Sequence, residues 1–174
     1  MTGNPINDLS DGIYEDGEWI SWGWINEQLY EQELKAKYPN ADLEVIEVFE
    51  ELVNAVESYK HVTGRYLSIF GELGELFSEI TFGIDRHKPC SQGSDGRLDN
   101  DFVEVKTITP EKSTDKVQVK RSGHFNKLVV VKISENSEYG HLEFQARMLD
   151  RKLMSKGSGK VATVSWSSIQ TKDV

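Results

Sequence analysis

The chain has one cysteine, four prolines and no long apolar run among its 174 residues. A single cysteine, Cys90, cannot form an internal disulfide, and no second cysteine stands near it to build a thiolate zinc site. No segment approaches the roughly 20 apolar residues that cross a bilayer. The N-terminal stretch MTGNPINDLSDGIYEDGEW has neither the positive start nor the apolar core of a secretory signal. We therefore expect a cytoplasmic protein without a membrane partner.

The formal net charge of −9 argues against a nucleic-acid partner, because phosphate groups are bound by Lys and Arg. The charge is distributed unevenly, however. Residues 1–100 carry 7 Lys and Arg against 20 Asp and Glu, a balance of −13, whereas residues 101–174 carry 13 against 9, a balance of +4. Because local potential steers association, the C-terminal half can still meet a polyanion.

Residues 11–24, DGIYEDGEWISWGW, predict a turn or short hairpin that leads into a helix. Trp19, Trp22 and Trp24 could stack on bases. Because the segment is acidic, we interpret these tryptophans instead as a packing anchor or a dimer contact. The chain could therefore form a homodimer. Apolar residues at helical spacing then predict helices at residues 25–38, 41–62 and 64–83.

Short strands follow, expected at residues 93–98, 101–108, 116–121, 127–133, 142–148 and 161–166, with a short helix at 149–154. The near-continuous apolar run KLVVVKI (127–133) is typical of a strand buried on both faces at the centre of a sheet. The pattern predicts an α/β fold and one domain over residues 1–174. Its parts are a mainly helical N-terminal region, residues 1–62, and a core, residues 63–174.

The strand DFVEVKTI carries charges on one face only. Residues two apart on a strand share a face, so Glu104 and Lys106 lie together, opposite Val103 and Val105. Asp95 stands just upstream, across a turn-forming DND segment that can fold the chain back as a hairpin. These charges are candidates for a site.

An Asp followed by Glu-x-Lys on the next strand, after a helix that bears glutamates, resembles the PD-(D/E)xK nuclease superfamily. The resemblance covers about residues 64 to 133 and rests on Asp95, Glu104 and Lys106; Ser94 stands where that family commonly has proline. It implies a restriction-endonuclease-like αβββ core, with a mixed central β-sheet flanked by helices and an N-terminal helical extension. It also implies a metal-dependent endonuclease, of restriction, repair or defence type, that hydrolyses phosphodiester bonds of nucleic acid, with DNA as the expected substrate.

The residue types fit that chemistry on their own. The Asp95 and Glu104 carboxylates and the Val105 carbonyl offer the hard oxygen ligands that Mg²⁺ or Mn²⁺ prefers. Lys106 could position or help to deprotonate the attacking water and offset the charge that builds on phosphate. Arginine would be too basic for the deprotonation.

The helix before the strands presents three glutamates on one face, at spacings i, i+3 and i+7. In the resembled family such a glutamate often reaches the metal. We expect Glu75 in this role, then Glu72, and Glu79 last; a solvated acidic face is the alternative. Gly71 and Gly74 each cost roughly 1 kcal/mol in a helix, which indicates close packing against the strands.

Downstream, Gln118 shares a strand face with Lys120, opposite Val117 and Val119. Gln118 could orient water or phosphate, and Lys120 and Arg121 could hold backbone phosphates. Two other interpretations stay open. The chain could be a non-catalytic module of the same fold that binds nucleic acid or protein, or VEVK could be an ordinary amphipathic strand with a weak ion pair.

Overall fold

The computed structural model describes residues 11–88, 93–136, 138–154 and 157–169, so the inference about Cys90 lies outside the described residues. Backbone contacts divide the chain into two compact units, an N-terminal unit (residues 1–39) and a C-terminal unit (residues 40–174). Each unit is described here by itself. The prediction of a single domain stays a prediction.

The N-terminal unit is a hairpin followed by a helix, with β1 (Gly12–Glu15), β2 (Glu18–Ser21) and α1 (Trp22–Lys37). Asp16 and Gly17 form the two-residue turn, both with positive φ (47° and 90°), as a twist-compatible hairpin turn requires. The Ser21 hydroxyl caps α1 by accepting a hydrogen bond from the Trp24 amide at 3.2 Å. The predicted hairpin that leads into a helix is therefore confirmed.

The C-terminal unit contains two helices and seven strands among its described residues. These elements are α2 (Leu43–Thr63), α3 (Phe70–Phe82), β3 (Asp85–Arg86), β4 (Gly96–Leu98), β5 (Asp101–Ile108), β6 (Lys116–Lys120), β7 (Lys127–Glu135), β8 (Leu142–Asp150) and β9 (Val161–Ser165), with short 3₁₀ turns η1 (Arg151–Leu153) and η2 (Trp166–Ser168).

Glycines in the left-handed region set the ends of both helices. Gly64, with φ 68°, ends α2, and Gly83, with φ 69°, ends α3. The helix predicted from residue 64 begins at Phe70 instead, because the chain must first leave the left-handed cap and Ile69 is not helical (φ −124°). The segment between the helices is therefore a connection rather than a helical turn.

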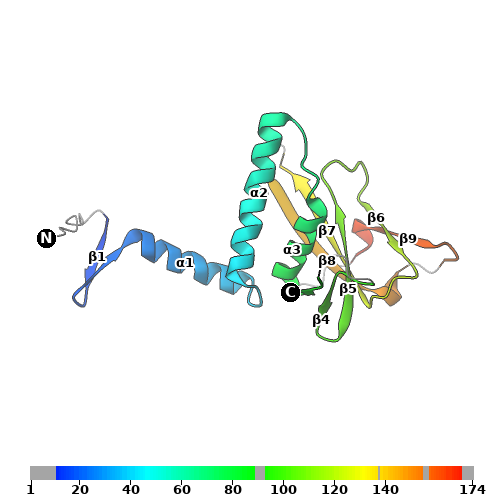
Figure 1. Cartoon of the computed structure of the whole chain (residues 1–174), viewed down its shortest axis with the longest axis horizontal. Helices are drawn as coiled ribbons and strands as arrows, with labels where there is room; N and C mark the ends of the chain where they lie inside the picture. Colours follow the sequence, from blue (N-terminus) through cyan, green and yellow to red (C-terminus); the bar gives the residue numbers. More distant parts are fainter. Residues whose placement is uncertain (1–10, 89–92, 137, 155–156, 170–174) are drawn as a thin grey trace. The chain divides into compact units, whose positions relative to one another are not determined.

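The main sheet has five strands in the order β3-β4-β5-β7-β8, with β5 parallel to β7 and the other neighbours antiparallel (Figure 1). β7 lies between β5 and β8, and its residues Leu128 to Val131 are completely buried. The predicted α/β class with a mixed sheet is confirmed, and so is the burial of the KLVVVKI strand on both faces, but the strand at the centre of the sheet is β5.

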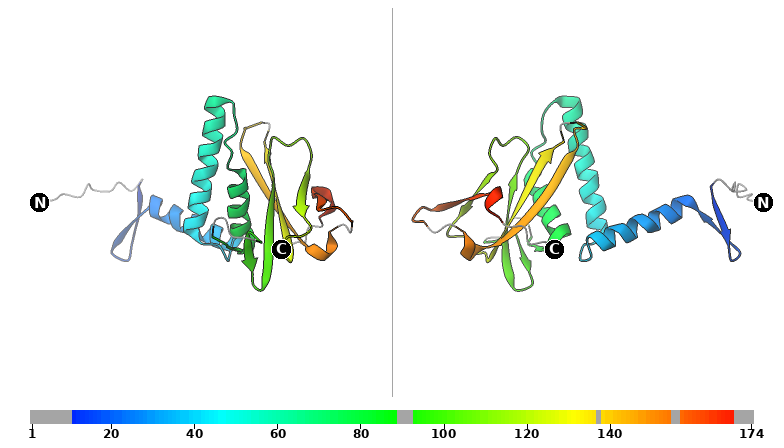
Figure 2. Two further views of the ribbon diagram at one scale, coloured as in Figure 1. Left: turned by 45° about the vertical axis from the view of Figure 1, so that its right-hand side comes forward. Right: turned by 180° about the vertical axis from the view of Figure 1, so that it is seen from behind.

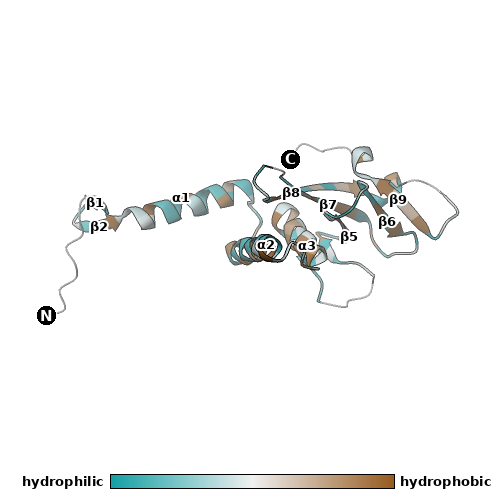
Figure 3. Cartoon of the chain, turned by 90° about the horizontal axis from the view of Figure 1, so that it is seen from above, coloured by the Kyte–Doolittle hydropathy of each residue, from teal (hydrophilic) through white to brown (hydrophobic). Residues whose placement is uncertain are grey.

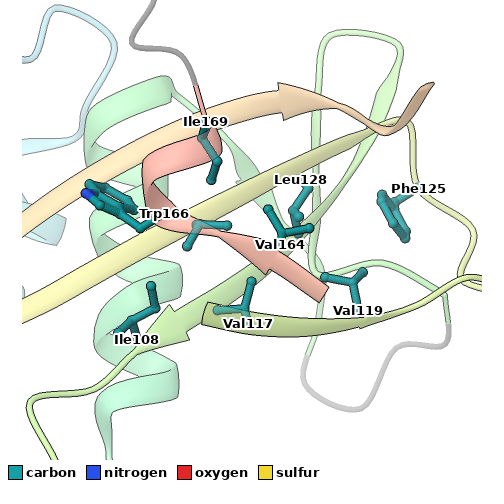
Figure 4. Close-up of a cluster of buried hydrophobic side chains, with 9 residues drawn as sticks. Ile108, Val117, Val119, Phe125, Leu128, Val164, Trp166 and Ile169 are labelled. Atoms are coloured by element: carbon teal, nitrogen blue, oxygen red, sulfur yellow. The ribbon is translucent and has the colours of Figure 1, made fainter. Parts of the chain in front are cut away.

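The strand at residues 116–120 was expected in the same run as its neighbours, and this is wrong. β6 pairs only with β9, antiparallel, in a separate two-stranded sheet. Its buried residues Val117 and Val119 pack on Ile108, Leu128 and Val130 of the main sheet (Figure 4). A strand that is apolar on one side covers a sheet face, whereas β7, apolar on both sides, takes the place beside β5.

The two faces of the main sheet are covered differently. Helix α3 packs on β5, β7 and β8 and is itself covered by α2, whereas the β6–β9 pair lies on the opposite face (Figure 2). A Cβ placed on Gly74 would lie 2.1 Å from the Thr107 hydroxyl oxygen on β5, but nothing stands within 4 Å of one on Gly71. The expected close approach is therefore confirmed at Gly74 and wrong at Gly71. Among the helices described, none combines the length and apolarity needed to cross a membrane.

Candidate functional site at the edge of strands β4 and β5

Strand β5 separates charged from apolar side chains as its alternation predicts. Val103 and Val105 are buried, on the side where Thr107 meets α3. Glu104 and Lys106 lie on the other face, with side chains that are 19% and 33% exposed. Both charges are thus accessible at the surface of an otherwise buried strand.

Asp95 lies directly before β4, at the point where β4 and β5 separate. The β4–β5 pairing begins with Gly96↔Val103, so Asp95 lies one residue outside it, next to β5. The Asp95 amide donates to the Val103 carbonyl at 2.9 Å, and the Asp95 carboxylate accepts from the Val105 amide at 2.7 Å. Main-chain contacts on both sides therefore fix the position of this carboxylate.

The Lys106 ammonium completes this group. Its Nζ donates to the Val105 carbonyl oxygen at 3.0 Å and forms an ion pair with the Glu104 carboxylate at 2.6 Å. One residue, Val105, thus contacts Asp95 through its amide and Lys106 through its carbonyl. Lys106 in turn contacts Glu104, whereas the joint role of these residues in a site stays a prediction.

The three glutamates of α3 have different partners. Arg86 of β3 binds two of them, Glu72 at 2.6 Å through Nη1 and Glu79 at 2.5 Å through Nε. Glu75 lies between these two on the helix and has no ion pair to Arg86. Arg86 thus binds Glu72 and Glu79 but not Glu75, and the expected role of Glu75 as a metal ligand stays a prediction.

Electrostatics place Glu75 close to the other charges. Burial raises the pKa of the Glu75 carboxyl, and the nearby Asp95 and Glu72 carboxylates raise it further, while Arg86 and Lys106 oppose the shift. The raised pKa reflects burial first and like charge second, because both make ionisation of the Glu75 carboxyl less favourable. Arg86 binds Glu72 and Glu79, and Lys106 binds Glu104.

Two positioning residues were missed by the sequence analysis. One is Arg86, for which the signal was a cation that follows an acidic helix. The other is His87, whose amide donates to the Asp95 carbonyl at 2.9 Å and whose ring Nδ1 lies 3.3 Å from the Ser94 hydroxyl. Ser94, where the resembled family commonly has proline, is buried. His87 had no ligand spacing in the sequence, so nothing marked it.

Gln118 is not brought to this group. It lies on the exposed face of β6, opposite the buried Val117 and Val119. Lys120 is exposed on the same strand, and Arg121 follows it. The predicted layout of polar and apolar faces on β6 is thus confirmed, whereas the roles of Gln118, Lys120 and Arg121 stay predictions.

Arg121 lines a cavity of about 740 Å³ that does not include Asp95, Glu104 or Lys106. Arg151 stands in the same wall, but its guanidinium is occupied by the carbonyls of Arg121, Gly123 and Phe125. The other lining residues are Asp101, Phe125, Asn126, Asp150, Lys152 and Met154. Both acids and bases line this cavity, so its charge does not select an anion by itself.

The donor chemistry of the β4–β5 site fits a small hard cation. Carboxylate and carbonyl oxygens suit Mg²⁺ or Mn²⁺, and the surplus of negative charge around Glu75 would be relieved by one. Among the described residues, however, no three or more His, Cys, Asp or Glu side chains are gathered in a group that could hold a metal ion. In this arrangement the Lys106 ammonium contacts two of the candidate ligands, Glu104 and the Val105 carbonyl.

The chain was also compared with known proteins. Neither the protein-family models nor the curated proteins contain a match to it.

Proposed function

We propose that the C-terminal unit is a metal-dependent nuclease that hydrolyses phosphodiester bonds, with DNA as the expected substrate. The observation that carries the proposal is the convergence of Asp95, Glu104, the Val105 peptide and Lys106 where β4 leaves β5. An isolated ion pair on a strand would not need an aspartate hydrogen-bonded to the residue between its two charges. The basic balance of residues 101–174 supports a polyanionic substrate.

Asp95, Glu104 and the Val105 carbonyl would hold the metal, with Glu75 as a further ligand. A bound Mg²⁺ or Mn²⁺ supplies Lewis-acid stabilisation of the phosphate and lowers the pKa of a coordinated water. The α3 carboxyl contributes only when it is ionised, so the raised pKa of Glu75 makes cation binding weaker in acid.

Lys106 contributes the only cation in direct contact with Glu104 among the described residues. Its ammonium can stabilise negative charge that builds on a phosphate at this edge of the sheet, and it can orient a water between the carboxylates. The hydrogen bond to the Val105 carbonyl oxygen holds the Lys106 ammonium next to the residue that also binds Asp95. Lys120 and Arg121 are proposed to hold the nucleic-acid backbone away from the reacting phosphate.

A non-catalytic module that binds nucleic acid is the second candidate. It is favoured by the absence of a gathered three-carboxylate group and by the direct Lys106–Glu104 ion pair. The two candidates differ in one measurement, which is whether the protein cuts nucleic acid.

The test is cleavage of supercoiled plasmid and of labelled single-stranded DNA and RNA with Mg²⁺ or Mn²⁺. Lys106→Ala should lower the cleavage rate by about 10²-fold or more, the usual contribution of a positioned catalytic group. Lys132→Ala is the matched control, because Lys132 is also a strand lysine paired to an acid at 2.6 Å, but to Asp115 rather than to the site. Equal rates for the two variants, or no cleavage by the unaltered protein, would contradict a nuclease.

Metal binding is measured separately, as the rise in melting temperature when Mg²⁺ or Mn²⁺ is added. A ligand that binds only the native state raises the melting temperature, because it stabilises that state by RT ln(1 + [ligand]/Kd). We expect this rise in the unaltered protein and in Lys132→Ala, and its loss in Asp95→Asn. A rise that survives in Asp95→Asn would place the metal elsewhere.

A further inference from the structure

The N-terminal unit has almost no core of its own. None of the 16 residues of α1 is buried, and in the hairpin only Gly12 is buried. Chains below about 40 residues rarely fold alone, and a lone two-stranded hairpin is marginal in water. The unit therefore needs an apolar surface to pack against.

Helix α1 offers a defined face for that purpose. Trp22, Ile25, Leu29 and Ala36 follow the 3, 4 and 7 spacing of one helix face. Trp22 is 43% exposed and Leu29 is 52% exposed, although both are large and apolar. Brown, hydrophobic bands alternate with teal ones along α1 in Figure 3. We call these four residues the α1 stripe.

An antiparallel copy of α1 pairs the two ends and the centre of the stripe, and it sets Ile25 against Glu33. Leu29 lies seven residues after Trp22 and seven before Ala36, so a two-fold axis at Leu29 sets Trp22 against Ala36 of the second copy. A large side chain then faces a small one, as close packing requires. A parallel pair would instead set Trp22 against Trp22.

Charge favours the same orientation. The hairpin at the start of α1 carries Glu15, Asp16 and Glu18, whereas the last turn of the helix carries Lys37. Antiparallel pairing brings the acidic end of one helix next to the basic end of the other, and a parallel pair would bring like charges together. A nucleic acid is a poor partner for this unit, because residues 11–39 hold seven acids and two bases.

We propose that the α1 stripe is a homodimerisation surface, on which two copies of the chain pair through antiparallel α1 helices centred on Leu29. The inference does not depend on the proposed nuclease activity. It is tested on the full chain without nucleic acid or metal.

The first test is the molar mass by light scattering and by sedimentation, from about 1 μM to about 1 mM, the range in which small interfaces associate. The unaltered protein should reach the dimer mass in this range, and Leu29→Glu should need at least about tenfold more protein to do so. Leu34→Glu is the control, because it makes the same substitution five residues along, on the other side of α1 from Leu29. A monomer at every concentration, or an equal dimer in Leu29→Glu, would overturn the proposal.

The second test covers the case in which Leu29→Glu loses helix content by circular dichroism. In a Cys90→Ser background, Leu29→Cys should form a disulfide between two copies. The axes of packed helices are about 8–10 Å apart, and the facing Cα atoms between those axes lie within the roughly 7 Å that a disulfide spans. Lys35→Cys should not do so at the same protein concentration. Equal cross-linking at both positions would exclude the two-fold axis at Leu29, and a cross-link at neither would exclude the pair.

Discussion

Two carboxylates in the C-terminal unit join a helix to the sheet, and their pKa values shift in opposite directions. Glu135, near the end of β7, accepts hydrogen bonds from Lys60 of α2 and from Tyr66. The Lys60 hydrogen bond lowers the pKa of Glu135, and the Tyr66 hydrogen bond lowers it further. This carboxylate is satisfied, and its charge stabilises the folded chain.

Glu75 at the β4–β5 site shows the reverse. Burial and two neighbouring carboxylates raise the pKa of Glu75, so its charge costs free energy in the folded chain. A buried carboxylate with a raised pKa is found more often at functional sites than a satisfied one is. The Glu135 cluster thus stabilises the fold, whereas the charge of Glu75 has a cost that the proposed metal would offset.

The largest effect on stability is expected from a substitution that moves α3, the helix of Glu75, away from β5. Gly74→Ala should destabilise the protein by about 1–3 kcal/mol, the range for overpacking, because the added Cβ meets the Thr107 side chain. Gly71→Ala should instead stabilise it by up to about 1 kcal/mol, since alanine is the better helix former and nothing stands near that position. Urea unfolding of both variants measures the difference. Equal effects would mean that α3 does not approach β5 at Gly74.

The Glu135 cluster, in which Lys60 and Tyr66 bind the carboxylate, is tested by Glu135→Gln. This change should cost about 1 kcal/mol at pH 7, or about 2–4 °C in melting temperature, because a partly exposed ion pair is lost. Glu138→Gln, an exposed neighbour, should change little. Because the folded pKa of Glu135 is lowered, its stabilisation is present above the unfolded value of about 4.3 and is lost as the pH falls through the folded value. The Glu135→Gln variant and the unaltered protein should therefore converge in strong acid, and a constant gap down to low pH would be inconsistent with this account.

The smallest effect is expected for Glu75→Gln. A carboxyl with a raised pKa favours the folded state below its unfolded pKa of about 4.3, and this advantage is lost as the pH rises through the folded value. Glu75→Gln should thus raise the melting temperature slightly at pH 7, by less than about 4 °C, and should reduce the gain on adding Mg²⁺. Glu47→Gln on the exposed face of α2 is the control. A loss of stability at pH 7 would show that Glu75 is satisfied in the fold, as Glu135 is.

Local patterns were enough to predict most elements and one half of the site. The spacing of Glu104 and Lys106 on a strand fixes their common face, and the DND turn predicts the hairpin that brings Asp95 to β5. The choice of Glu75 came from the sequence as an ordered preference. What distinguishes it from Glu72 and Glu79 is Arg86, which is distant along the chain from Glu72 and whose partners no period reveals.

The sequence by itself determined the hairpin and helix of residues 11–37, the two-sided burial of β7 and the charged face of β5, because each follows from periods of two or 3.6 residues within one segment. Only the tertiary structure decided that β6 pairs with β9, that Gly74 rather than Gly71 meets the sheet, and that Arg86 separates Glu75 from its neighbours. These outcomes depend on which distant parts of the fold pack against each other. The spacing of residues within one segment does not contain that information.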